Sequence, residues 1–309
     1  MGAIVLVHGI AQEQRGAEDI AAETVAALVS GIQNASQDMR SEERERLEAL
    51  AQRIRKRDRD VEVTVAFYGS AFLQSRTDDV DAKRFKDELA LAMIKRARDD
   101  SSRTRTQDIA ARQLQEIEAS GEAQGLGRMA GAIVERLGQI PGIADWMMDR
   151  AVGLIPALDQ VGQYMREPNV REFTRNEVRR LMTPDTRVLI GHSLGSVVAY
   201  DIAREQTNPL PLLLTLGSPL GLKQIIYDRL DPQPPAFPAK VHRWVNVADR
   251  EDYVASTLNL EPLFSPMPTG AIFDNVESID NGNEPHALRR YLTKKVVGSA
   301  ILQAMMPLV

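Results

Sequence analysis

Residues 187–203 read Arg-Val-Leu-Ile-Gly-His-Ser-Leu-Gly-Ser-Val-Val-Ala-Tyr-Asp-Ile-Ala. The run that ends at Ile190 has the apolar pattern of a strand in a parallel sheet, and the residues after Gly195 have helical character. Between them stands the pattern Gly-x-Ser-x-Gly, with Ser193 between Gly191 and Gly195. A turn this tight needs glycine on both flanks, because a Cβ there would collide with the neighbouring strand or helix. The segment therefore predicts a strand, a sharp turn and a helix, with Ser193 as a candidate nucleophile.

Short apolar runs of the same kind recur along the chain and predict further strands at residues 3–7, 61–67, 212–216 and 241–247, with 271–278 as a candidate for a sixth. Helix-length segments lie between them, as at residues 17–32 and 83–98. Between Ser41 and Asp60, charges of both signs surround one apolar stripe, formed by Leu47, Leu50, Ala51 and Ile54. This alternation predicts an α/β fold whose mostly parallel, doubly wound sheet is flanked by helices and has the first strand in its interior.

Residues 101–165 contain no strand-like run, and glycine and proline repeatedly interrupt their helical pattern. We therefore expect an α/β core of residues 1–100 and 166–309, with 101–165 as a helical insertion. The second half of this insertion is unusually apolar, which allows two interpretations. It packs onto the sheet in the ordinary way, or it forms a lid that also lines an apolar substrate pocket.

The composition is that of a folded protein without a basic surplus. Of 309 residues, 43% are hydrophobic and 26% are charged, with 38 basic and 43 acidic side chains and a formal net charge of −5. Such a balance argues against nucleic acid as a partner. The sequence has no cysteine, which excludes disulfides, thiolate metal sites and a cysteine nucleophile.

The beginning of the chain and its apolar segments also bear on its location. No basic leader precedes the first apolar run, and no uncharged apolar run reaches the roughly 18 residues that a membrane span needs. The most apolar stretch, residues 133–161, is interrupted by acidic and basic side chains. We expect a cytoplasmic protein without a transmembrane segment.

A serine hydroxyl becomes a good nucleophile only when a histidine removes its proton and a carboxylate orients that histidine. The sequence has four histidines. In this architecture the chain order is nucleophile, acid, base, which eliminates His8 and leaves His242 and His286. His286 is favoured because it lies in a loop of turn-forming residues just before a terminal helix, whereas His242 begins a predicted strand. No acid at a strand end lies between Ser193 and His242.

The acid is expected at the carboxyl end of the strand before His286, where the chain reads Asp249-Arg-Glu-Asp252-Tyr-Val-Ala. Asp252 is favoured because Asp-Tyr-Val resembles the Asp-x-Val turn that often carries the acid in such triads. Asp249 is the alternative acid, and it can instead cap the turn that aims its neighbour. Glu251 is the least favoured of the three.

Acyl transfer also needs backbone N–H groups that point at the developing oxyanion. One is expected from Leu194, the residue after the nucleophile. The other is expected from the loop after the first strand, where Gly9 allows a sharp turn and either Ile10 or Ala11 presents its N–H. His8 and His192 are interpreted as buried packing residues rather than proton carriers.

These motifs resemble the α/β-hydrolase superfamily, and within it the lipase and esterase branch. The resemblance rests on the His-Gly after the first strand, on the nucleophile elbow at 191–196 and on the Gly-Ser-Pro turn within 216–221, and it covers residues 1–10 and about 159–290. Tyr164 and Arg171 lie in a segment similar to the helix before the elbow strand in some bacterial members. Two features depart from the family. Its two usual N-terminal strands are missing, and the 101–165 insertion matches no family pattern.

The resemblance implies a serine esterase that cleaves a small-molecule ester or lipid through an acyl-enzyme, with no metal or organic cofactor. A thioesterase or an acyltransferase would share the first half-reaction. A hypothesis of another class is a binding or signalling module on the same fold, in which the 101–165 insertion docks a partner protein.

Overall fold

The computed structural model of the chain describes residues 2–10, 16–37, 39–58, 61–72, 79–120, 132–143, 154–255 and 257–306. These residues form a six-stranded sheet with the order β2-β1-β3-β4-β5-β6, and every neighbouring pair is parallel. The strands are β1 (Gly2–Val7), β2 (Val61–Ala66), β3 (Thr186–His192), β4 (Leu210–Leu216), β5 (Val241–Asp249) and β6 (Ile272–Ile279). All six predicted strands are confirmed, including the candidate sixth strand and the interior position of the first.

The burial of each strand follows from its place in the sheet. β1 and β4 are buried along their whole length, as expected of central strands whose two faces are both covered. β2 and β6 are the edge strands, and both are partly exposed. The sequence grouped residues 61–67 with the fully buried strands, but Glu62 interrupts that run and its side chain is exposed.

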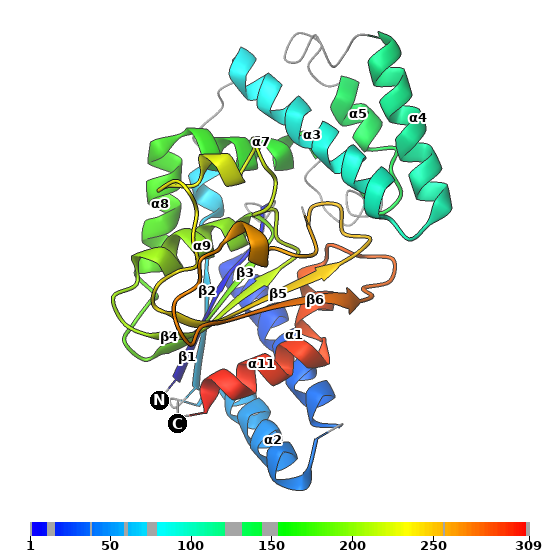
Figure 1. The fold of residues 1–309 in the computed structure, drawn as a ribbon. Coiled ribbons are helices and arrows are strands. Elements are labelled where there is room, and N and C mark those ends of the chain that lie inside the picture. The colour runs from blue at the N-terminus through cyan, green and yellow to red at the C-terminus, as the bar shows by residue number, and fades with distance from the viewer. Residues whose placement is uncertain are drawn as a thin grey trace.

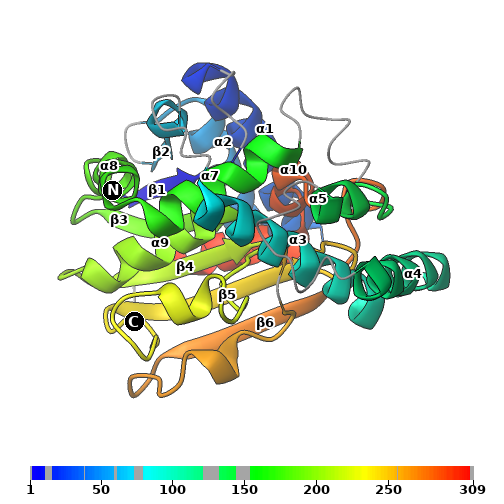
Figure 2. The ribbon, with the colours of Figure 1, turned by 90° about the horizontal axis from the view of Figure 1, so that it is seen from above.

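Helices cover both faces of the sheet (Figures 1 and 2). One face is covered by α1 (Ala17–Ser36), α2 (Ser41–Arg55), α10 (Leu288–Leu292) and α11 (Lys295–Met305), and the other by α3 (Val80–Asp100), α7 (Leu154–Arg166), α8 (Pro168–Arg179) and α9 (Leu194–Glu205). Alternate residues of β1 enter the two cores: Val5 packs into one and Ile4 into the other. The predicted apolar stripe of α2 is buried as expected.

A group of helices stands beside the carboxyl edge of the sheet. α4 (Thr104–Ser120) and α5 (Ala132–Leu137) pack against α3, and α3 also packs against α7 (Figure 1). The expected domain boundary at residue 100 falls at the junction of α3 and α4. α3 therefore belongs to the expected core but packs against helices of the expected insertion. Apolar residues of α3, α4, α5 and α7 join one core with the sheet. Much of the apolar second half of the insertion, including residues 144–153, lies outside the described residues.

Short 3₁₀ helices at η1 (Gly69–Phe72), η3 (Tyr227–Arg229) and η4 (Glu261–Leu263) lie in the connections. Within the described ranges, no helix combines the length and the apolar character needed to cross a membrane.

Candidate active site

Ser193 occupies the sharp turn between β3 and α9. Its backbone has φ 53° and ψ −131°, and residues other than glycine rarely adopt a positive φ of this kind. The turn is held by hydrogen bonds: the Ser193 N–H donates to the carbonyl of Leu216 at 3.1 Å, and the Ser193 carbonyl accepts from the N–H and the hydroxyl of Ser196 at 2.9 and 2.6 Å. Strain of this kind persists only where the surroundings over-determine it.

The two flanking glycines are required by close packing. A Cβ at Gly191 would lie 2.5 Å from the Cα of Ser196, and a Cβ at Gly195 would collide with the backbone carbonyls of Val7 and His8. The structure thus confirms the steric reason for which the sequence needed glycine at both positions.

His286 and Asp252 form a buried pair. The Nδ1 atom of His286 is 2.8 Å from both carboxylate oxygens of Asp252, and the two residues are 4% and 1% exposed. The N–H groups of Val254 and Ala255 also donate to Oδ1 of Asp252, at 3.1 and 3.4 Å. Because Nδ1 faces the carboxylate, Nε2 is the ring nitrogen left to face a substrate or a nucleophile.

The turn that carries Ser193 lies next to this pair. The Nε2 atom of His192 is 2.9 Å from the carbonyl oxygen of His286, and the two imidazole rings lie 4.7 Å apart. Leu216, whose carbonyl accepts from the Ser193 N–H, is followed by Gly217. A Cβ on Gly217 would lie 2.5 Å from Oδ2 of Asp252. The carboxyl ends of parallel strands share one edge, so the structure brings Ser193, Asp252 and His286 together there.

Asp249 contacts the backbone of the histidine loop rather than the imidazole. Its Oδ1 accepts from the N–H of Glu251 at 2.8 Å, and its Oδ2 accepts from the N–H of Asn281 at 2.5 Å. The side chain of Asn281 in turn donates to the carbonyl of Pro285 at 2.8 Å. Burial raises the pKa of Asp249 above its usual range. The alternative acid therefore ties the two loops of the site together, and Asp252 is the carboxylate that contacts His286.

Glu251 points away from His286 toward the junction of α3 and α4. Its carboxylate accepts from the hydroxyls of Ser101 at 2.8 Å, Ser102 at 2.7 Å and Tyr253 at 2.6 Å, and from the N–H of Ser102 at 2.7 Å. Burial raises the pKa of Glu251, but these hydrogen bonds outweigh burial and hold it below the ordinary value. These hydrogen bonds connect the loop that carries Asp252 to the junction of α3 and α4.

His242 lies far from this site along its strand. It stands near the amino end of β5, whereas Asp249 ends the same strand, and its side chain is exposed. The structure therefore separates His242 from Ser193 and brings His286 to it.

The loop after β1 also reaches Ser193. A Cβ on Gly9 would lie 2.9 Å from the Cβ of Ser193. His8 is buried and stacks on the ring of Tyr68 at 4.3 Å, and the Tyr68 hydroxyl donates to the His8 carbonyl. Burial raises the pKa of Tyr68, which keeps that hydroxyl protonated. Ile10 is the last described residue of this segment, and Ala11 is outside the described residues.

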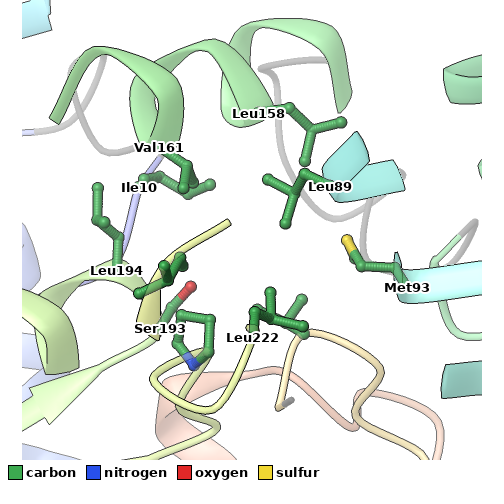
Figure 3. A pocket seen from close by; sticks show the side chains of 11 residues that line it. Ile10, Leu89, Met93, Leu158, Val161, Ser193, Leu194 and Leu222 are labelled. Atoms are coloured by element: carbon green, nitrogen blue, oxygen red, sulfur yellow. The ribbon is translucent and has the colours of Figure 1, made fainter. Parts of the chain in front are cut away.

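Ser193 opens onto a narrow apolar pocket with a volume of about 20 Å³ (Figure 3). In Figure 3 the serine oxygen points into the space between α3, α7 and the loop that carries Leu222. Ser193 is the one polar side chain among the described lining residues, which also include Ile10, Leu89, Met93, Leu158, Val161, Leu194, Pro219, Leu222, Ile226 and Val254. The pocket offers apolar contact and a single hydroxyl.

Sequence reasoning missed the residues that hold the site. Tyr291 donates its hydroxyl to Oδ2 of Asp252 at 2.6 Å, and His192, expected only to pack, contacts the backbone of His286. Tyr291 follows His286 by five residues and lies on α10, so its spacing alone placed it near the site. Nothing in the sequence indicated that its hydroxyl faces Asp252.

Together these groups supply a hydroxyl, an imidazole and a carboxylate, which are the three groups that nucleophilic acyl chemistry uses. In the part of the chain that the structure describes, no group of three or more His, Asp or Glu side chains is arranged to hold a metal ion. Comparisons of the chain with protein-family models, with curated proteins and with solved structures found no match.

Proposed function

We propose that this chain is a serine hydrolase of carboxylic esters on an α/β-hydrolase fold, with Ser193, His286 and Asp252 as its triad. The observation that carries the proposal is the buried contact between Asp252 and His286 beside a strained serine turn that opens onto a pocket. A buried histidine held by a carboxylate next to a strained serine turn is an arrangement typical of functional sites.

In the proposed reaction, Oγ of Ser193 attacks the acyl carbon while Nε2 of His286 accepts the hydroxyl proton. Asp252 holds the imidazole in the tautomer with its proton on Nδ1 and stabilises the imidazolium that forms. The N–H of Leu194, with that of Ile10 or Ala11, stabilises the negative charge on the carbonyl oxygen. His286 then gives its proton to the departing alkoxide, which leaves as an alcohol, and an acyl-Ser193 ester remains.

The second half-reaction uses the same groups in reverse. His286 takes a proton from a water molecule, whose oxygen attacks the acyl carbon. The bond to Oγ of Ser193 breaks, the serine oxygen recovers its proton from His286, and the carboxylic acid departs. No external redox partner is required.

The apolar pocket supports an acyl group or another apolar substrate portion rather than a charged one, because burying a charge there would leave it unpaired. In this proposal α3 and α7 form one wall of the pocket and act as the lid-like cap over Ser193. The apolar character of the lining is compatible with the acyl portion of a small-molecule ester or a lipid ester.

The test is covalent labelling by a fluorophosphonate probe, followed by intact mass measurement and peptide mapping of residues 187–203. We expect the wild-type chain to gain one adduct and Ser193→Ala to gain none. Hydrolysis of p-nitrophenyl butyrate should fall by at least about 10⁴-fold in the same variant. Ser36→Ala is the matched control, because Ser36 is also buried but donates to the carbonyl of Gln33 in α1.

Failure of the wild-type chain to label, or equal labelling of Ser193→Ala, would contradict the proposal. The non-catalytic binding module would then be the better interpretation of the fold.

A further inference from the structure

Tyr291 is buried within α10 with its hydroxyl between the two acids of the site. The hydroxyl donates to Oδ2 of Asp252 at 2.6 Å and accepts from the N–H of Asp249 at 3.1 Å. We propose that Tyr291 is a positioning residue of the reaction, which fixes the Asp252 carboxylate against His286 and moderates the basicity of that histidine. The inference rests on the function proposed above.

The two oxygens of Asp252 are held in different ways. Oδ1 accepts from the backbone N–H groups of Val254 and Ala255, which belong to the same loop. Oδ2 accepts from Tyr291, which belongs to a helix 39 residues further along the chain. Among the described residues, Tyr291 is thus the side chain that joins Asp252 to the C-terminal helices. Because both oxygens lie 2.8 Å from Nδ1 of His286, rotation of the carboxylate would alter that contact directly.

The direction of the hydrogen bonds at the tyrosine is settled by its partners. The backbone N–H of Asp249 can only donate, so the Tyr291 oxygen accepts there and its proton is directed to Asp252. Burial, followed by the negative charge of Asp252, raises the pKa of Tyr291 well above its usual range. The hydroxyl therefore stays protonated near neutral pH and remains a donor to Asp252.

A hydrogen bond to a carboxylate lowers its proton affinity and spreads its negative charge. The Tyr291 hydroxyl thus weakens the attraction of Asp252 for a proton at His286. A general base must be neutral to accept the serine proton. Without the hydroxyl, the same carboxylate would stabilise the imidazolium more strongly.

Other titratable and charged groups surround Asp252 and stay in place when the tyrosine changes. Asp249 ends β5, Glu251 lies on the loop that carries Asp252, His192 lies at the end of β3, and Tyr253 binds Glu251. The buried Arg96 of α3 donates to the carbonyl of Ala255, and the charge of Asp252 acts on it. Since each is common to the wild-type chain and the variant, their difference reports the hydroxyl alone.

The first test compares Tyr291→Phe with Tyr200→Phe. Tyr200 is a matched control, because it is equally buried and its hydroxyl donates to the carbonyl and accepts from the N–H of Ala236, away from Ser193. For Tyr291→Phe we expect kcat on p-nitrophenyl butyrate to fall roughly 10-fold with KM unchanged. The acidic limb of the pH profile of kcat should move up by about 0.5 pH unit. Tyr200→Phe should keep the wild-type profile.

The second test keeps the hydroxyl and should shift the acidic limb of the pH profile in the opposite direction. Replacement of Tyr291 by 3-fluorotyrosine makes the phenol a stronger hydrogen-bond donor, so the acidic limb should move down instead of up. This variant also serves if Tyr291→Phe does not fold, which circular dichroism and thermal unfolding would show.

A pH profile that stays at the wild-type position in Tyr291→Phe or in the fluorotyrosine variant would overturn the inference, as would equal shifts in Tyr200→Phe. Such results leave the proposed function standing if the wild-type chain still labels with the fluorophosphonate at Ser193. Absence of wild-type labelling is the separate result that rejects the proposed function itself.

Discussion

Asp249 and Asp252 lie three residues apart at the end of β5, and both carboxylates are buried. Their partners differ. Asp252 accepts from the ring of His286, whereas Asp249 accepts from two backbone N–H groups that fix the shape of the site. The local sequence could not separate them, because that distinction depends on a loop that returns more than thirty residues later.

Substitution of each acid by asparagine tests this assignment. In Asp252→Asn the amide favours the wrong tautomer of His286, and we expect kcat to fall on the order of 10⁴-fold with the thermal midpoint little changed. In Asp249→Asn one carbonyl oxygen can still accept a backbone N–H, so we expect a loss of about 10-fold or less. Steady-state kinetics at pH 8 measure both, and equal losses would refute the division of roles.

The strained serine turn was predictable because its tight geometry imposes a pattern on neighbouring residues. Ser193 needs small neighbours at the turn, and that requirement is written in five consecutive residues. Tyr291 and Ser101 act through contacts 39 and 150 residues away along the chain, and many tyrosines and serines are buried for packing alone. Such roles require the fold before they can be assigned.

At the scale of elements, the contact of α1 with α10 and α11 depends on two glycines. A Cβ on Gly31 would collide with the carbonyl of Leu292, and a Cβ on Gly298 would collide with the carbonyl of Gly31. Both obstacles are backbone atoms, which cannot rotate away as a flexible side chain can. The helices therefore approach closely only because neither position carries a side chain.

Gly31→Ala should destabilise the chain, although alanine favours a helix more than glycine does. Overpacking of this kind costs about 1–3 kcal/mol, which for a chain of this length corresponds to a fall of roughly 1.5–5 °C in Tm. Thermal unfolding followed by circular dichroism measures it. Ser30→Ala, one position earlier on α1, is the control, and an unchanged or higher Tm in Gly31→Ala would contradict the packing argument.

The strands were predictable as elements because parallel strands buried on both faces are short apolar runs between helices. Two aspects of their arrangement were not. β2 is an edge strand, a property of strand order rather than of residues 61–66. α3 packs with α4 and α5, although it precedes the expected insertion, because its apolar residues face those helices as well as the sheet.

At the scale of the whole molecule, Glu251 joins the sheet to the helical group. Its carboxylate receives hydrogen bonds from the α3–α4 junction, while its neighbour Asp252 contacts His286. Arg96 of α3 adds a hydrogen bond to the carbonyl of Ala255 at 2.9 Å. The helices that wall the pocket and the loop that carries the proposed acid are therefore one connected structure, and their stability should respond to the charge on Glu251.

The pKa of Glu251 is lowered in the folded chain, and this determines how stability changes with pH. Folding favours the ionised carboxylate, so its contribution to stability is fully present above the ordinary glutamate pKa of 4.5 and disappears as the pH falls through the lower folded value. Glu251→Gln removes this ionisation, and we expect it to cost about 1–3 kcal/mol of the free energy of unfolding at pH 7. The difference from the wild-type chain should shrink steadily below about pH 4.5.

Urea unfolding of the wild-type chain and Glu251→Gln between pH 3.5 and 8 measures this difference directly. Glu48→Gln is the matched control, because Glu48 is exposed on α2, and its difference from the wild-type chain should stay near zero throughout. Other carboxylates titrate in the same range, but they are present in both chains and cancel. If the difference in the free energy of unfolding stayed constant down to pH 3.5, the shape of the Glu251 side chain would account for its contribution. Its charge would then not stabilise the contact between the α3–α4 junction and the loop of Asp252.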